Sequence, residues 1–103
     1  MRMVCLGLNH RTAPVEIRER FSVPSHRLQN AGKSIRELPG VEQCVVLSTC
    51  NRMEIYYWSD NPENAREHIL SHFLGDGRGK VDMASHFYCH QGAFALEHLC
   101  RVL

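Results

Sequence analysis

The chain has 103 residues, of which 44% are hydrophobic and 22% charged, and its formal net charge is +1. These values fit a single globular domain with a modest core, and they exclude a disordered or collagen-like chain. No apolar run approaches the roughly 18 to 20 residues that span a bilayer, and polar residues 9–11 end the first apolar run too early for a signal peptide, so we expect a cytoplasmic protein without membrane contact.

The charges are unevenly spread along the chain. Residues 1–36 contain seven Lys or Arg side chains against two Glu, whereas residues 37–75 contain two Arg against six acidic side chains. A basic stretch of this kind can bind phosphates. It can equally be a solvated helix face, and charge alone favours that plainer explanation.

The first third of the chain combines a short apolar run with two helical segments. The apolar residues 4–8 predict a buried strand. Pro14 suits the start of a helical turn over residues 15–18. Ser25 is a candidate N-cap for a helix over residues 25–38, which the following Pro-Gly pair ends.

Two strands are predicted next, at residues 43–48 and 52–59, where β-branched and aromatic side chains are concentrated. Residues 49–51 are the only connection between these strands. A connection of three residues implies a tight hairpin turn. We therefore expect Cys50 at the tip of that turn.

The second half of the chain predicts two more helices around one short strand. A capping side chain, a proline and an early acid at residues 60–63 begin a helix that ends at Gly75, and residues 76–80 form a loop. Residues 87–89 are a strand candidate, and apolar spacing from Gln91 onward predicts a closing helix. Because that helix keeps its apolar stripe to the last residue without a stop signal, we expect a piece of a longer protein.

The predicted order is strand, helix, strand, strand, helix, strand and a closing helix. This order is that of the split βαβ, ferredoxin-like class of α+β sandwich, with a mostly antiparallel sheet. Five residues on the predicted apolar faces are expected in the core: Leu28, Ile35, Val45, Leu47 and Ile55.

The five cysteines have no paired spacing, and in a cytoplasmic chain we expect them to be thiols. Cys5, Cys44 and Cys100 lie among apolar residues and are expected to be buried. Cys50 differs, because its neighbours over residues 48–52 are all polar.

Cys50 in a tight polar connection would be held rigidly and partly exposed. Arg52, two residues away, can favour the nucleophilic thiolate through its charge, or it can grip a carboxylate with two hydrogen bonds. Thr49 and Asn51 add neutral donors that could orient a carbonyl or an ester. The group suits acyl transfer from a carboxylated substrate, although a lone cysteine beside an arginine is more often incidental.

Three ordered motifs resemble one known family. Residues 48–54, Ser-Thr-Cys-Asn-Arg-Met-Glu, resemble the S-T-C-N-R-x-E signature of glutamyl-tRNA reductases. Residues 7–19 resemble their opening G-x-N-H-x-x-A-P-V-x-x-R-E, and residues 90–102 resemble the start of their H-x-x-x-x-A-V-x-H-L-F-R-V-A-S-G segment. The three matches occur at the family's spacing and cover nearly the whole chain.

The resemblance implies a reaction. Cys50 would attack the ester that joins glutamate to the 3′ end of its tRNA, giving an enzyme thioester and free tRNA. A hydride from NADPH would then reduce the thioester to glutamate-1-semialdehyde, the precursor of 5-aminolevulinate and of haem or chlorophyll. On this resemblance the chain is the catalytic domain of an NADPH-dependent oxidoreductase.

The resemblance also implies roles for individual residues. Cys50 and His98 would be catalytic, with His98 as the acid/base or carbonyl-polarising group. The substrate-binding residues would be Thr49, Asn51, Arg52 and Glu54. Arg52 would hold the side-chain carboxylate of glutamate, and a two-pronged arginine would discriminate against glutaminyl-tRNA, which lacks that anion.

Partners follow from the same resemblance: glutamyl-tRNA, bound across the basic first third; a second copy of the protein; and glutamate-1-semialdehyde aminotransferase. No glycine-rich dinucleotide fingerprint occurs in the chain. We therefore expect residues 1–103 to be the catalytic domain alone, with the NADPH-binding and dimerisation domains absent, so that it cannot complete the reduction. Met53 and Cys100 depart from the family pattern at positions expected only to pack.

Other roles remain open for the histidines and cysteines near the end of the chain. His10 and His90 are expected to be structural partners of backbone carbonyls. Cys89, His90, His98 and Cys100 are ligand types that zinc uses, but their spacing fits no common zinc motif, so no metal site is expected.

Two rival functions use different features. A non-catalytic RNA-binding module would present Tyr56, Tyr57 and Trp58 on an exposed sheet face, yet no RNP-like sequence accompanies them. A thiol redox domain would need a resolving cysteine, and none lies near Cys50 in the sequence.

Overall fold

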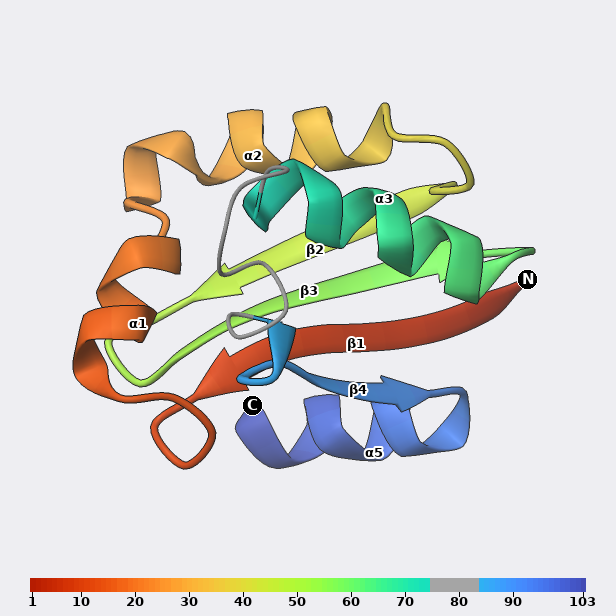
Figure 1. The fold of residues 1–103 in the computed structure, drawn as a ribbon. Coiled ribbons are helices and arrows are strands. Elements are labelled where there is room, and N and C mark those ends of the chain that lie inside the picture. Colours follow the sequence, from red (N-terminus) through yellow and green to blue (C-terminus); the bar gives the residue numbers. More distant parts are fainter. Residues whose placement is uncertain (75–83) are drawn as a thin grey trace.

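The computed structural model describes residues 1–74 and 84–103, which form one four-stranded antiparallel sheet flanked by helices (Figure 1). The strands lie in the order β2-β3-β1-β4. The elements are β1 (Arg2–Asn9), α1 (Val15–Phe21), the 3-10 turn η1 (Ser25–Arg27), α2 (Leu28–Arg36), β2 (Gln43–Ser48), β3 (Arg52–Ser59), α3 (Pro62–Leu74), β4 (Tyr88–Gln91) and α5 (Ala93–Val102).

The topology is the predicted split βαβ arrangement. β3 lies between β1 and β2 and pairs antiparallel with both, and β1 also pairs antiparallel with β4. The β1–β3 ladder runs from Arg2 opposite Ser59 to Asn9 opposite Arg52. The expected ferredoxin-like α+β class is therefore confirmed, and the turn between β2 and β3 is at one end of the sheet (Figure 1).

The larger core lies between the sheet and the helices α2 and α3, which cover one face (Figure 1). Alternate residues of β1 and β3 enter this core because successive side chains of a strand point to opposite faces. Ile35 and Ile55 are fully buried there, as predicted. Leu28 is only half-buried.

The opposite face of the sheet has a smaller cover, α5, which packs on β4 and β1. β2 is the far edge strand, so α5 does not reach it (Figure 1). Val45 is consequently 56% exposed, and its predicted place in the core is wrong. Leu47, on the same face, is half-buried against the small cluster around Tyr56.

Several predicted bounds differ from the structure. The first helical turn, predicted over residues 15–18, continues to Phe21. The helix predicted over 25–38 divides into η1 and the shorter α2, because Ser25 lies inside a 3-10 turn that begins after Pro24 and caps no α-helix. β4 begins one residue later than predicted and runs to Gln91.

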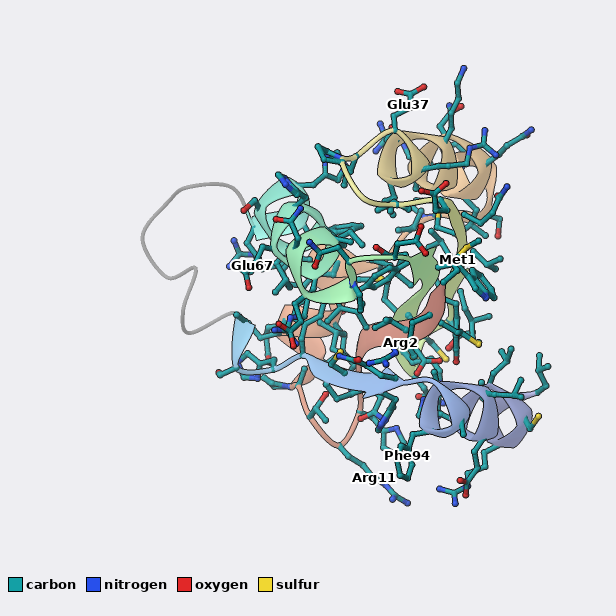
Figure 2. The ribbon with its side chains drawn as sticks, turned by 90° about the vertical axis from the view of Figure 1, so that its right-hand side faces the viewer. Met1, Arg2, Arg11, Glu37, Glu67 and Phe94 are labelled. Carbon is teal, nitrogen blue, oxygen red and sulfur yellow. The ribbon has the colours of Figure 1, made fainter. Side chains whose placement is uncertain are left out.

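The closing helix also begins later than predicted. Gly92 has a φ of +60°, a conformation that favours glycine, and α5 starts only after it. On α5, Cys100 is exposed rather than buried, and Phe94 projects into solvent (Figure 2). The predicted helix end at Gly75 and the loop over 76–80 lie outside the described residues. No helix in the described ranges combines the length and apolarity needed to cross a bilayer.

Candidate active site

The turn between β2 and β3 is held by hydrogen bonds of Thr49. Its amide donates to the carbonyl of Arg52 at 2.8 Å. Its hydroxyl Oγ1 accepts from the amides of Asn51 at 3.2 Å and Arg52 at 3.3 Å. Cys50 is exposed at the tip of this turn, as predicted.

A side chain from α1 reaches the same turn. Arg18 Nη1 donates a hydrogen bond to the main-chain carbonyl of Cys50 at 2.9 Å. A cavity of about 270 Å³ lies beside this contact. It is lined by Val15, Arg18, Glu19, Ser22, Thr49 and Cys50. Cys50 therefore borders a space large enough for a small acyl group.

Arg52 begins β3 on the opposite side of the turn. Its side chain is 22% exposed, and its Nη1 lies 3.8 Å from Glu54 Oε2. Residues two apart on a strand share a face, which is why these two side chains meet. Part of the Arg52 guanidinium is thus engaged by a carboxylate of this chain, and the exposed part remains available to a ligand.

Glu54 is fully buried and accepts hydrogen bonds from several elements. The Tyr56 hydroxyl donates to Oε1 at 2.9 Å, and the Cys5 thiol lies 3.7 Å from Oε2. Oε2 also accepts from the Tyr88 hydroxyl and pairs with His98 Nε2. A buried carboxylate requires such partners, because its desolvation is otherwise costly.

These hydrogen bonds decide the charge of Glu54. Burial by itself raises the pKa of Glu54, but the hydrogen bonds from Tyr88, His98 and Tyr56 outweigh it and hold the pKa below its ordinary value. Burial, and then the neighbouring carboxylate, raises the pKa of Cys5 and Tyr88. At neutral pH Glu54 is therefore a carboxylate, and the Cys5 thiol and the Tyr88 hydroxyl beside it keep their protons.

The Glu54 partners come from four elements that meet on the α5 face of the sheet. Arg52, Glu54 and Tyr56 alternate along β3, Cys5 stands on β1, Tyr88 on β4 and His98 on α5. We call Cys5, Glu54, Tyr56, Tyr88 and His98 the Glu54 cluster. Sequence reasoning missed Cys5, Tyr56 and Tyr88 in it.

The Glu54 cluster contains a possible set of metal ligands. One ligand atom each from Cys5, Glu54 and His98 lie within 4.8 Å of one another. Sulfur, carboxylate and imidazole suit zinc. However, each of these side chains already has a hydrogen-bonding partner within the cluster, so the donor set is satisfied without an ion. The zinc set considered from sequence is not brought together, since Cys100 is exposed on α5.

Two histidines lie side by side next to the cluster. The ring centroids of His90 and His98 are 4.7 Å apart. Burial, followed by the neighbouring His98, lowers the pKa of His90. Both rings line a cavity of about 230 Å³ with Phe94, Glu97 and Arg101. His90, expected to be structural, thus borders the same space as His98, whereas His10 is exposed after β1.

The predicted site residues therefore fall into two groups. Arg52, Glu54 and His98 come together through the Glu54 cluster, and Thr49 and Cys50 meet Arg18 at the turn. In the described ranges, no hydrogen bond or ion pair links Cys50 to His98. Asn51 is exposed in the turn, where its main-chain N–H donates to the Thr49 hydroxyl oxygen.

The aromatic residues of β3 do not form an exposed platform. Tyr56 is 1% exposed and Tyr57 is fully buried. Stacking of bases on a sheet requires accessible rings. The non-catalytic RNA-binding alternative is therefore not favoured.

Comparisons with known proteins agree with these features. A family model described as "Glutamyl-tRNAGlu reductase, N-terminal domain" matches residues 6–103. The chain is 82% identical over 103 residues to a glutamyl-tRNA reductase of Akkermansia muciniphila, covering 100% of this chain and 30% of that protein. It is 41% identical over 104 residues to one of Synechococcus sp. (strain RCC307), covering 99% and 23%.

A solved structure has the same fold. The glutamyl-tRNA reductase of Methanopyrus kandleri superposes with a TM-score of 0.63 at 27% identity, covering 97% of this chain and 21% of that chain. The chain therefore spans less than a third of the length of each relative named here.

Proposed function

The chain belongs to the family of glutamyl-tRNA reductase amino-terminal domains, and on that premise we propose that it forms the covalent intermediate in the NADPH-dependent reduction of glutamyl-tRNA to glutamate-1-semialdehyde. This reaction begins the synthesis of 5-aminolevulinate and tetrapyrroles. The observation that carries the proposal is Cys50, an exposed thiol on a hydrogen-bonded turn beside a cavity of about 270 Å³.

In the proposed step the Cys50 thiolate attacks the carbonyl carbon of the glutamyl ester. A carbon–sulfur bond forms, the carbon–oxygen bond to the terminal ribose breaks, and the ribose oxygen takes up a proton as tRNA leaves. The products are a glutamyl thioester on Cys50 and free tRNA. A rigid turn favours this chemistry because it holds the nucleophile close to its attack geometry.

Arg52 is the proposed partner of the substrate's side-chain carboxylate. Its guanidinium stands at the rim of the sheet, 22% exposed, with Glu54 at 3.8 Å as its internal partner. Glu54 orients the Arg52 guanidinium but engages only part of it, so other N–H donors remain free to bind a substrate carboxylate. Thr49 and Asn51 shape the turn through their own hydrogen bonds and supply neutral donors near the ester.

His98 is proposed to act on the substrate rather than on the thiol. Its Nε2 is occupied by Glu54, and the part of the chain that the structure describes contains no hydrogen bond between His98 and Cys50. The cavity of about 230 Å³ beside its ring leaves room for a ligand. We propose that His98 polarises the carbonyl or delivers the proton to the leaving oxygen.

NADPH does not fit the described residues of this chain. The dinucleotide fingerprint opens a helix between two parallel strands, whereas every paired strand here is antiparallel. The cofactor would supply the hydride that reduces the thioester. We therefore propose that this step depends on other segments of the longer proteins, as do a homodimer and contact with glutamate-1-semialdehyde aminotransferase.

The proposed nucleic-acid partner is tRNA charged with glutamate, bound across the basic residues of 1–36. Phosphate contacts release counterions, so binding should weaken steeply with added salt. An affinity that is flat between low and high salt would identify the basic stretch as a solvated face.

The test is acid-quenched mass spectrometry of the chain after incubation with glutamyl-tRNA. We expect uncharged tRNA to be released as a glutamyl adduct forms on the Cys50 peptide. Slow hydrolysis of that thioester should then give glutamate and the free Cys50 thiol, with no effect of NADPH. Cys50→Ser should abolish the adduct, because a serine hydroxyl lacks the accessible anion of a thiolate. An adduct on another cysteine, or full deacylation by the Cys50→Ser variant, would contradict the proposal.

A further inference from the structure

Among the described residues, one hydrogen bond joins α1 to the turn between β2 and β3, and Arg18 makes it. It lies 32 residues from Cys50 in the sequence, and its Nη1 donates to the Cys50 carbonyl at 2.9 Å. The turn amides of Asn51 and Arg52 are already bonded to Thr49 Oγ1. Thr49 therefore holds the turn from within, and Arg18 holds the Cys50 carbonyl from outside.

The contact requires an unfavourable placement of the rest of the side chain. Arg18 Nε is buried, and it has no hydrogen-bond partner. A buried donor without a partner loses its hydration without compensation, so it is seldom kept for stability alone. The arginine is thus held at this position at a cost, which is a common property of functional sites.

Arg18 and Cys50 also border the same cavity of about 270 Å³. A guanidinium keeps its charge at all relevant pH values. A fixed positive charge at the edge of this cavity favours the negative charge that develops on an attacked ester.

We propose that Arg18 is a positioning residue for Cys50: its guanidinium fixes the main chain of the turn so that the thiol borders the substrate cavity in one orientation. The inference rests on the proposed function of Cys50 and extends it to a residue on another element. Arg18 acts through the turn, and Arg52 remains the proposed carboxylate partner.

The test compares Arg18→Gln and Arg18→Lys with Arg20→Gln, in the 103-residue chain carrying Cys100→Ser to remove the other exposed thiol. Arg20 is on the same helix and exposed, and among the described residues its side chain makes no hydrogen bond or ion pair. The control therefore removes the same charge from α1 without touching the turn. Iodoacetamide, a small uncharged probe, reports Cys50 alkylation by peptide mass spectrometry, and deacylation of glutamyl-tRNA reports kcat and KM.

For Arg18→Gln we expect the rate of Cys50 alkylation at pH 7 and the kcat of deacylation each to fall about tenfold, since small misplacements of a reacting group have effects of this size or larger. KM should rise as well, because Arg18 belongs to the basic residues of 1–36 proposed to bind tRNA, so the alkylation rate and kcat are the readouts that decide positioning. Arg18→Lys retains the charge and one donor and should recover part of both rates. Arg20→Gln should leave Cys50 alkylation unchanged.

Three results would overturn the inference while leaving the proposed function intact. They are unchanged alkylation and kcat in Arg18→Gln, an equal loss of alkylation in Arg20→Gln, or losses that follow thermal unfolding of the variant with no recovery in Arg18→Lys. If instead the unsubstituted chain forms no glutamyl adduct, the proposed function fails. The alkylation series still decides whether Arg18 positions the thiol.

Discussion

Gly7 lies directly opposite Glu54 in the β1–β3 ladder, and the absence of its side chain makes room for the buried carboxylate. A Cβ atom on Gly7 would lie 2.8 Å from Glu54 Cγ and 2.6 Å from the Met53 carbonyl oxygen. The second contact is with backbone, which a small side-chain rotation cannot relieve. The glycine of the opening motif is therefore a steric requirement of the Glu54 cluster.

Gly7→Ala should accordingly destabilise the chain by about 1–3 kcal/mol, the usual range for overpacking a filled site. Urea unfolding followed by circular dichroism measures this change. The matched control is Gly32→Ala in α2, where the added Cβ would have 4.0 Å to Cys44 Sγ. There we expect a gain of about 0.5–1 kcal/mol, because alanine favours helix. Equal effects at the two glycines would contradict the steric explanation.

The charge of Glu54 predicts how stability changes with pH. Its pKa is lower in the folded chain than the ordinary 4.5, so the unfolded chain binds more protons as pH falls past that value. The stabilisation from Glu54 is thus complete above about pH 4.5 and is lost as pH falls through the folded pKa. The free energy of unfolding should decrease over that window.

Glu54→Gln should remove this part of the pH dependence. At pH 7 the variant should be less stable by about 3 kcal/mol, because the amide NH₂ is itself a donor and would face donors that the carboxylate oxygen had bonded. Urea titrations at pH 7 and pH 3.5 measure both effects. A wild-type and a variant curve that stay parallel down to pH 3.5 would exclude Glu54 as the source.

Sequence patterns predicted the sheet well because strand periodicity and tight turns are local signals. They placed Cys50 correctly at the tip between β2 and β3. They failed for Val45, because the alternation along β2 does not say which face a distant helix will cover. The answer depends on where α5 packs, which is a property of the assembled sheet.

The candidate site was predictable only in its motif residues. Glu54 and Tyr56 share a face at a spacing of two, which was a usable local signal. Cys5 and Tyr88 gave none, and Arg18, although it belongs to the opening motif, gave no signal of its partner, since these three reach Glu54 or Cys50 across 49, 34 and 32 residues. Contacts of that separation become visible only when the strand order is known.

The exposure of the cysteines predicts an order of labelling. Cys50 and Cys100 are exposed, Cys44 and Cys89 half-buried, and Cys5 buried with its pKa raised by desolvation. A thiol reagent at pH 7.5 should modify the first two first and Cys5 only on unfolding. Timed quenching and peptide mass spectrometry give the order. Early labelling of Cys5 would show that the Glu54 cluster opens readily.

Arg52→Lys should weaken the choice of substrate more than the reactivity of the thiol. Lysine retains the charge beside Glu54 but cannot hold a carboxylate with two parallel hydrogen bonds. We expect the preference for glutamyl-tRNA over glutaminyl-tRNA in deacylation to fall at least about tenfold. The rate of Cys50 alkylation by iodoacetamide should stay within about twofold, because the main-chain hydrogen bonds of the turn are untouched. An unchanged preference would assign the carboxylate to another group.

The variants His98→Asn and Tyr88→Phe distinguish a chemical role of His98 from the structural role of the Glu54 hydrogen bonds around it. Removal of a general acid or polarising group typically slows turnover by about 10²–10⁴, so His98→Asn should reduce kcat by this order with little change in tRNA binding. Tyr88→Phe removes one hydrogen bond from Glu54 and leaves His98 in place. Its kcat should fall far less, by about tenfold at most, since the imidazole that acts on the substrate is retained.

The pH dependence of stability shows whether Tyr88 acts by supporting Glu54 or by contacting the substrate. The hydrogen bond from Tyr88 is the largest of those that lower the pKa of Glu54, so its loss should raise that pKa towards the ordinary value. The pH at which stability is lost on acidification should then be higher in Tyr88→Phe. Tyr57→Phe is the control, because the Tyr57 hydroxyl donates to the Pro62 carbonyl away from the Glu54 cluster, and it should leave that pH unchanged. Deacylation kinetics and urea titrations of the three variants provide the measurements. If Tyr88→Phe slowed kcat as much as His98→Asn without raising the pH at which stability is lost, Tyr88 would meet the substrate itself and would not act only as a support of Glu54.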